Sequence, residues 1–175
     1  CLTGVPGRFG TRIAYARRVG LGDVKEIFVT QFGSPGQTRV SEDGVLALLP
    51  AWAPGGALAF TGYRRGNPDV YVGDRLFSSR PGQNTGIAFS PDGRYAALTL
   101  AVDGWVDLYL VDGRTGEEVA RLTKSRAIDT SPSWSPDGRR MVFVSDRDGN
   151  PNLWMMNADG SEQRPLSLPG SYNTS

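Results

Sequence analysis

The 175-residue sequence contains no histidine and a single cysteine, Cys1. Without histidine, the chain cannot assemble a Ser-His-Asp or Cys-His catalytic site from its own residues. Metal sites built on histidine and cysteine spacing are excluded for the same reason. One cysteine also excludes a disulfide within the chain. The composition therefore predicts a protein that is not an enzyme and that binds no cofactor.

An excess of one charge and long apolar runs are also missing. Lys and Arg number 19 against 18 Asp and Glu, so the formal net charge of +1 gives no reason to expect a nucleic-acid or anionic-membrane partner. No stretch approaches the roughly 20 apolar residues of a spanning helix, and the first ten residues lack the apolar region of a signal peptide. We expect a soluble chain that binds no nucleic acid and does not insert into a membrane.

An internal repeat is the strongest signal that the sequence does contain. Residues 134–160 read WSPDGRRMVFVSDRDGNPNLWMMNADG, residues 89–116 read FSPDGRYAALTLAVDGWVDLYLVDGRTG, and residues 52–74 carry a fainter copy. Alignment on the turn proline places Pro54, Pro91 and Pro136 in register, 37 and 45 residues apart. Repeats of this length are typical of β-propeller blades.

Two apolar stretches in each repeat are predicted strands. The first follows the turn, is rich in Ala, Val, Leu and Phe, and has no helical period; it occupies residues 57–61, 95–100 and 141–145. The second places an acidic or amide residue before an aliphatic–aromatic–aliphatic triplet, at residues 26–29, 69–72, 107–110 and 152–155. Because side chains alternate along a strand, the two aliphatic residues should lie on one face and the aromatic residue on the other, both covered by neighbouring blades.

Turn sequences separate these strands. SPDG places proline at the second position of a turn, where its fixed φ fits, and ends in the Asp-Gly pair that turns favour. Further glycine-rich turns give four strands per repeat, so we predict an all-β propeller of four-stranded antiparallel blades with essentially no helix. The first unit begins at its second strand. The approximate blades are residues 11–48, 49–82, 83–127 and 128–170, and residues 171–175 begin a further blade.

The repeat as a whole resembles a known family. The stretch SPSWSPDGRRMVFVSDRDGNPNLWMMNADGSEQRPL is similar to the repeat of TolB-family propellers, and LTGVPGRFGTRIAYA resembles the junction before the first blade of that family. The resemblance implies a six-bladed propeller, of which about four blades are present, and a periplasmic location. It also implies a non-enzymatic role in the Tol–Pal system, which supports outer-membrane integrity. The implied partner is the peptidoglycan-associated lipoprotein Pal, with other Tol proteins contacted through an N-terminal domain outside this sequence.

An alternative function stays open at this point. The same repeat occurs in the gating propellers of prolyl-oligopeptidase-like and tricorn-like peptidases, so the chain could be a gating or regulatory propeller.

Each predicted innermost strand begins with a polar segment. Thr85 lies six residues before the turn residue Pro91, and Thr130 lies six residues before Pro136. In a propeller the starts of these strands surround the mouth of the central channel. The resemblance implies that this face receives Pal. The candidate partner-binding residues are Gln83, Asn84, Thr85, Gly86, Asp129, Thr130, Ser131, Asn173 and Thr174. The alternative is that their side chains only satisfy hydrogen bonds where each strand begins.

Two weaker patterns have structural explanations. DRDGN, at residues 146–150, spaces Asp and Asn as a calcium loop does, but the bidentate Glu is missing, which favours a hairpin turn. Trp52, Phe89 and Trp134 precede the turn proline at equivalent positions, which favours packing between blades over a stacking platform for a ligand.

Overall fold

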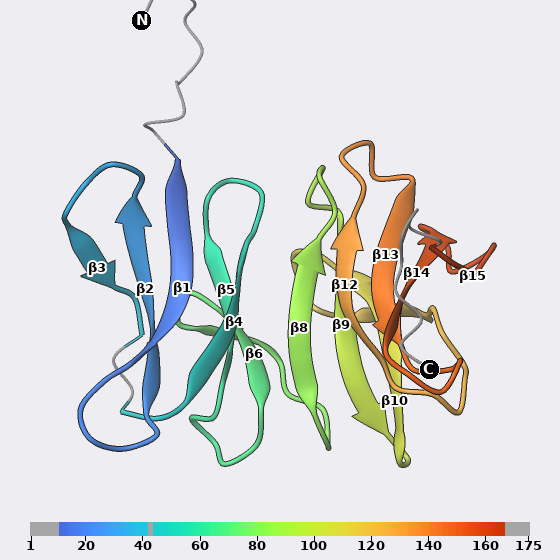
Figure 1. Cartoon of the computed structure of the whole chain (residues 1–175), viewed down its shortest axis with the longest axis horizontal. Coiled ribbons are helices and arrows are strands. Elements are labelled where there is room, and N and C mark those ends of the chain that lie inside the picture. Colours follow the sequence, from blue (N-terminus) through green and yellow to red (C-terminus); the bar gives the residue numbers. More distant parts are fainter. Residues whose placement is uncertain (1–10, 42–43, 167–175) are drawn as a thin grey trace, which may run out of the picture.

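The computed structural model describes residues 11–41 and 44–166 of the chain, and every regular element within them is a β-strand. The strands form four antiparallel sheets, here called blades 1 to 4. Figure 1 shows the blades standing side by side, from the blue first blade to the orange and red fourth blade. The all-β prediction with antiparallel blades is confirmed.

Each blade is built from consecutive strands, so neighbours in the sheet are neighbours in the sequence. Blade 1 contains β1 (Arg12–Arg18), β2 (Lys25–Gln31) and β3 (Gln37–Arg39). Blade 2 contains β4 (Ala47–Trp52), β5 (Leu58–Gly62), β6 (Asp69–Val72) and β7 (Arg75–Ser78). Blade 3 contains β8 (Asn84–Phe89), β9 (Tyr95–Val102), β10 (Trp105–Asp112) and β11 (Glu118–Arg121). Blade 4 contains β12 (Asp129–Trp134), β13 (Arg140–Ser145), β14 (Asn152–Asn157) and β15 (Arg164–Pro165).

The aliphatic–aromatic–aliphatic triplet behaves as its alternation predicts. On β10, Leu108 and Leu110 belong to the apolar layer between blades 3 and 4. Tyr109, between them in sequence, belongs to the layer between blades 2 and 3. Blade 3 is therefore buried on both faces, and each fully buried side chain of this size stabilises the fold by about 1.5–3 kcal/mol.

Three apolar layers hold the blades together. Between blades 1 and 2 lie Ile27, Ala47, Leu58, Phe60 and Tyr71. Between blades 2 and 3 lie Ala59, Val70, Phe77, Ile87, Ala96, Leu98, Leu100, Tyr109 and Val111. Between blades 3 and 4 lie Ala97, Leu108, Leu110, Leu122, Met141, Phe143 and Met156. The partly buried rings of Trp52, Phe89 and Trp134 pack against these layers, one ring per layer, in agreement with a packing role.

A buried carboxylate near the start of the last strand but one bonds to the outermost strand of its blade and to the segment that follows, on β10 in blade 3 and on β2 in the three-stranded blade 1. In blade 3, Asp107 accepts hydrogen bonds from Arg121 Nη2, Thr123 Oγ1 and the backbone N–H of Ser125. In blade 1, Glu26 makes the equivalent bonds with Arg39, Ser41 and the N–H of Gly44. Burial alone would raise the pKa of Glu26, but the bonds from Ser41, Arg39 and Gly44 outweigh it and lower the pKa below 4.5. These two carboxylate–arginine pairs tie the outermost strand to the strand beside it.

Candidate functional site

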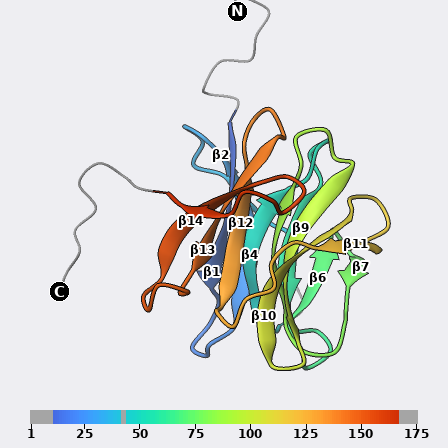
Figure 2. The same ribbon diagram turned by 90° about the vertical axis from the view of Figure 1, so that its right-hand side faces the viewer.

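The starts of three innermost strands meet at one end of the molecule. β8 contacts both β4 and β12, and the arrowheads of β8 and β12 point the same way (Figure 1). β8 lies between β4 and β12 in Figure 1, and the view turned by 90° brings the three strands one behind another (Figure 2). We call the first three residues of these strands, 47–49, 84–86 and 129–131, together with Gln83, the mouth.

Each innermost strand carries the same bulge at the mouth. Against the regular second strand, the first strand has one extra residue between Leu48 and Ala51, between Thr85 and Ala88, and between Thr130 and Ser133. A bulge of this kind bends a strand, breaks the ladder of backbone hydrogen bonds locally and redirects side chains. The repeated bulge therefore turns the third residue of each strand out of the regular pairing.

The third residue has left-handed backbone in all three blades. The φ values are 53° at Leu49, 59° at Gly86 and 55° at Ser131. Glycine adopts this conformation at no steric cost, whereas an L side chain pays about 1–2 kcal/mol. Strained backbone of this type gathers at functional sites, where the surrounding structure holds it in place. Leu49, 53% exposed, and the exposed Ser131 are the two side chains presented in this way.

Asn84 is completely buried and serves the connection from blade 2. Its Oδ1 accepts from Ser78 Oγ and from the N–H of Arg80, both at 2.9 Å. Its Nδ2 donates to the carbonyl oxygens of Arg80 and Gly82, at 2.6 and 3.3 Å. The amide therefore closes a loop that brings the chain from the outer edge of blade 2 to the centre of blade 3.

Asp129 is also completely buried and has the same role before blade 4. Its Oδ2 accepts from Arg147 Nη2 at 2.9 Å and from Ser125 Oγ at 3.0 Å. Arg147 extends this network, because its Nη1 donates to Gln163 Oε1 at 2.9 Å and its guanidinium lies 4.4 Å from the Trp154 ring centre. The carboxylate thus fixes the start of β12 to the turn after β13, which carries Arg147, and to the loop before β12, which carries Ser125.

The structure brings most of the candidate residues to one place but gives them different roles. Gln83 and Ser131 are exposed, Thr85, Gly86 and Thr130 are half-buried, and Asn84 and Asp129 are enclosed. Asn173 and Thr174, like the further blade predicted at residues 171–175, lie outside the described residues. Contact with a partner is therefore open to Gln83, Thr85, Gly86, Thr130 and Ser131, while Asn84 and Asp129 position their neighbours.

Leu49 belongs to the mouth, but it is not among the candidate residues because those were chosen as polar residues at the starts of strands. The repeat contains the signal that finds it, because Leu48 lies six residues before Pro54 as Thr85 lies six before Pro91. Arg147 is also missing from the candidate residues. Nothing in the spacing of DRDGN indicates that its arginine reaches Asp129.

The DRDGN segment forms a turn in which Asp146 is already engaged. The Asp146 carbonyl accepts from the N–H of Gly149 at 2.8 Å, and its Oδ1 accepts from the N–H of Ile128 at 2.7 Å. Among the described residues, no group of three or more Asp, Glu, Cys or His side chains is arranged to hold a metal ion. The same part of the chain contains no helix long and apolar enough to cross a membrane.

Comparison with known proteins places this architecture in a family. Residues 1–175 match the family described as the TolB beta propeller domain. The protein TolB homolog of Chlorobium luteolum is 37% identical over 173 residues, which cover 93% of this chain and 38% of that protein. The Tol-Pal system protein TolB of Bordetella pertussis is 36% identical over 168 residues, covering 92% of this chain and 38% of that protein.

A solved structure shows the same likeness. The crystal structure of TolB from Acinetobacter baumannii superposes with a TM-score of 0.85 at 28% identity, covering 98% of this chain and 45% of that one. The chain thus spans about two fifths of the length of the curated relatives it matches. Blades, repeats and sequence identity agree, and the chain belongs to the TolB β-propeller family.

Proposed function

We propose that this chain is part of a periplasmic, non-enzymatic scaffold of the Tol–Pal system, which binds the lipoprotein Pal at the mouth and so supports outer-membrane integrity. The observation that carries the proposal is the match, along 92% of this chain, to a relative named as a Tol-Pal system protein. The lack of histidine, which rules out the common hydrolytic triads within this chain, supports a binding role.

The mouth supplies the features that a protein partner needs. Neighbouring blades place Leu49, Gly86 and Ser131 at equivalent bulges, where Leu49 and Ser131 have left-handed backbone and are exposed. A few central residues dominate the energy of most interfaces. Gln83, Thr85, Gly86, Thr130 and Ser131 are the proposed contacts, and the buried Asn84 and Asp129 are proposed as positioning residues.

Calorimetric titration of purified Pal tests this site. The test uses a chimera in which residues 11–166 replace the matching blades of the Bordetella pertussis relative, because the chain spans about two fifths of that protein. Ser131→Gly removes the side chain and relieves the left-handed strain, so it should weaken Pal binding by more than about 1 kcal/mol without lowering stability. Gln83→Ala should weaken binding to a similar extent.

Glu117→Ala is the matched control, because Glu117 is exposed on an outer loop. Its effect on binding should stay within about 0.5 kcal/mol. Asp129→Ala should reduce stability and binding together, since it leaves Arg147 without its carboxylate. Unchanged affinity in both Ser131→Gly and Gln83→Ala would place Pal elsewhere on the propeller.

A further inference from the structure

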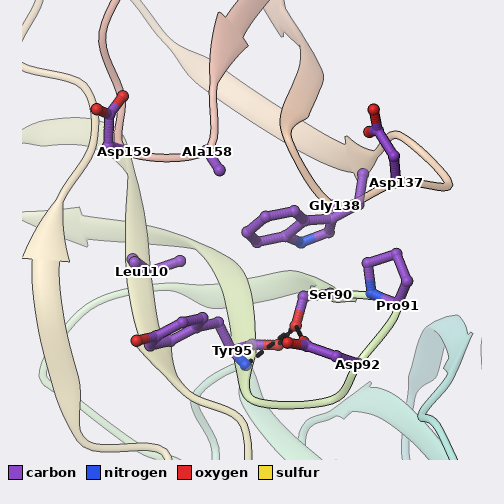
Figure 3. Close-up of a pocket in the computed structure, with 10 residues that line it drawn as sticks. Ser90, Pro91, Asp92, Tyr95, Leu110, Asp137, Gly138, Ala158 and Asp159 are labelled. Carbon is purple, nitrogen blue, oxygen red and sulfur yellow. Dashed lines mark hydrogen bonds between the residues drawn. The ribbon is translucent and has the colours of Figure 1, made fainter.

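A cavity opens between blades 3 and 4, at the opposite end of the innermost strands from the mouth. It has a volume of about 410 Å³. Figure 3 shows Ser90, Pro91, Tyr95 and Leu110 of blade 3 on one side and the residues of blade 4 on the other. Trp134 also lines the cavity, and its Nε1 donates to the Ala88 carbonyl at 3.0 Å, which fixes the indole across the two blades.

The walls are apolar and aromatic. Tyr95 and Trp134 contribute rings, and Leu110 and Ala158 contribute aliphatic surface. Aromatic faces attract cations, Trp most strongly, and a planar guanidinium can stack on them. Arg94, which does not line the cavity, already lies 5.5 Å from the Tyr95 ring centre and shows that this ring accepts a guanidinium nearby.

The charged residues that line the cavity are all acidic, although Arg94 and Arg139 lie close to Asp92 and Asp137 in their turns. Asp92, Asp137 and Asp159 are among the lining residues, and no Lys or Arg is. Hydrogen bonds from Ser90, Ser135 and Ser161 and from backbone N–H groups lower the pKa of each carboxyl, so all three are ionised at neutral pH. An occupant with a positive group is favoured, and one with a carboxylate is repelled.

The blade repeat does not itself require two aromatic rings together with three carboxylates at this place. At the equivalent position between blades 2 and 3, Ala57 replaces Tyr95, Gly55 replaces Asp92 and Arg114 replaces Asp159, as the strand registers align them. Blade geometry needs the proline and glycine of the turn but neither the second ring nor the extra carboxylates. The aromatic wall and the negative charge are therefore particular to the junction of blades 3 and 4.

We propose that this cavity, here called the Tyr95–Trp134 slot, binds an arginine side chain of a polypeptide partner. The guanidinium stacks between the rings near the three carboxylates, and its aliphatic stem packs against Leu110 and Ala158. The slot shares no residue with the mouth, so its occupancy and the proposed Pal contact can be tested separately.

The probe is N-acetyl-arginine N-methylamide, titrated into the full ¹⁵N-labelled chain. The indole N–H of Trp134, assigned with Trp134→Phe, should shift in a saturable way, while those of Trp52, Trp105 and Trp154 move little. The citrulline analogue has the same shape without the charge and should bind about fivefold more weakly or not at all. N-acetyl-arginine, which keeps a free α-carboxylate but has no α-ammonium, should bind more weakly than the N-methylamide because the acidic rim repels its carboxylate.

Three variants complete the test. Asp137→Asn/Asp159→Asn keeps the acceptors of both turns and should weaken binding about tenfold, and Tyr95→Leu keeps the apolar wall and should weaken it about fivefold. Asp148→Asn, on an exposed turn outside the slot, should bind as the parent chain does. The proposal is overturned if Trp134 does not respond, if the citrulline analogue binds as tightly as the arginine probe, if N-acetyl-arginine binds more tightly than the N-methylamide, or if the double variant retains full affinity.

Discussion

At the scale of single residues, one difference between the blade repeats changes the pKa of a buried carboxyl group. The outermost pair of strands places Phe28 opposite Arg39 in blade 1 and Tyr109 opposite Arg121 in blade 3, and these arginines bond the buried carboxylates. In blade 2 the corresponding partner of Tyr71 is Leu76. Asp69 is thus 3% exposed without the equivalent arginine, and burial raises its pKa above 3.8 although Arg65 acts to lower it.

This difference predicts opposite effects of the same change. A folded-state pKa above the unfolded value means that the carboxyl stabilises the fold when protonated and that this contribution is lost as pH rises through the folded pKa. Asp69→Asn should therefore raise the free energy of unfolding at pH 7, with an advantage that fades below about pH 4. Asp107→Asn should lower it by about 1.5–3 kcal/mol, because Arg121 loses a charged partner.

Urea unfolding at pH 7 and at pH 3.5 measures both variants. Equal destabilisation by the two variants at pH 7 would mean that Asp69 has a compensating partner. The missing arginine on the outermost strand would then not explain the difference between blade 2 and blade 3.

At the scale of strands and turns, the sequence predicts most of the fold because its signals are local. Alternation fixes the two faces of β10, and Ser-Pro-Asp-Gly fixes a turn whose Asp92 accepts the N–H of Arg94 at 3.1 Å. The bulges were not predictable in this way. Nothing about Leu49 or Ser131 as a residue type indicates left-handed backbone, since the pairing of the whole blade imposes it.

The candidate site shows the same limit. Polar residues at strand starts suggest an exposed surface, but Asn84 and Asp129 are enclosed by loops that arrive from the preceding blade. The Tyr95–Trp134 slot depends on two residues from different blades, and no spacing within one repeat brings them together. Contacts between blades are therefore the part of the site that sequence reasoning misses.

Close approach between blades makes one turn glycine irreplaceable. Gly116, in the turn after β10, has a φ of 80°, and a Cβ there would overlap the backbone carbonyl of Phe77 in blade 2. Gly149 has a φ of 94° and open space around it. Both positions penalise an L side chain by about 1–2 kcal/mol, but only Gly116 adds a clash with backbone that cannot move cheaply.

Gly116→Ala should therefore lower the free energy of unfolding by at least about 1 kcal/mol more than Gly149→Ala does. Chemical denaturation of the two variants under one set of conditions gives this difference directly. If the two losses are equal, blades 2 and 3 can separate at this turn without cost.

At the scale of the whole molecule, the end blades differ from the middle ones in what covers them. Leu108 and Leu110 of blade 3 are 0% and 9% exposed beneath blade 4. Leu153, which occupies the place of Leu108 in blade 4, is 40% exposed. Ile13 on β1 of blade 1 is 45% exposed. The pattern that buries both faces of an inner blade therefore leaves apolar surface on the outer blades of the described structure.

Exposed apolar surface of this kind favours association, since covering it gains about 25 cal/mol per Å². The isolated chain should self-associate through the outer face of blade 4, and sedimentation velocity at tens of micromolar should show dimers or larger species. Leu153→Lys places a charge in the centre of that face and should shift the distribution toward monomer. Val119→Lys, which changes a residue that is 53% exposed on β11 of blade 3, should leave the distribution unchanged because it lies outside the face. A monomeric parent chain that melts cooperatively would show that the outer face of blade 4 is stable in water without a covering blade.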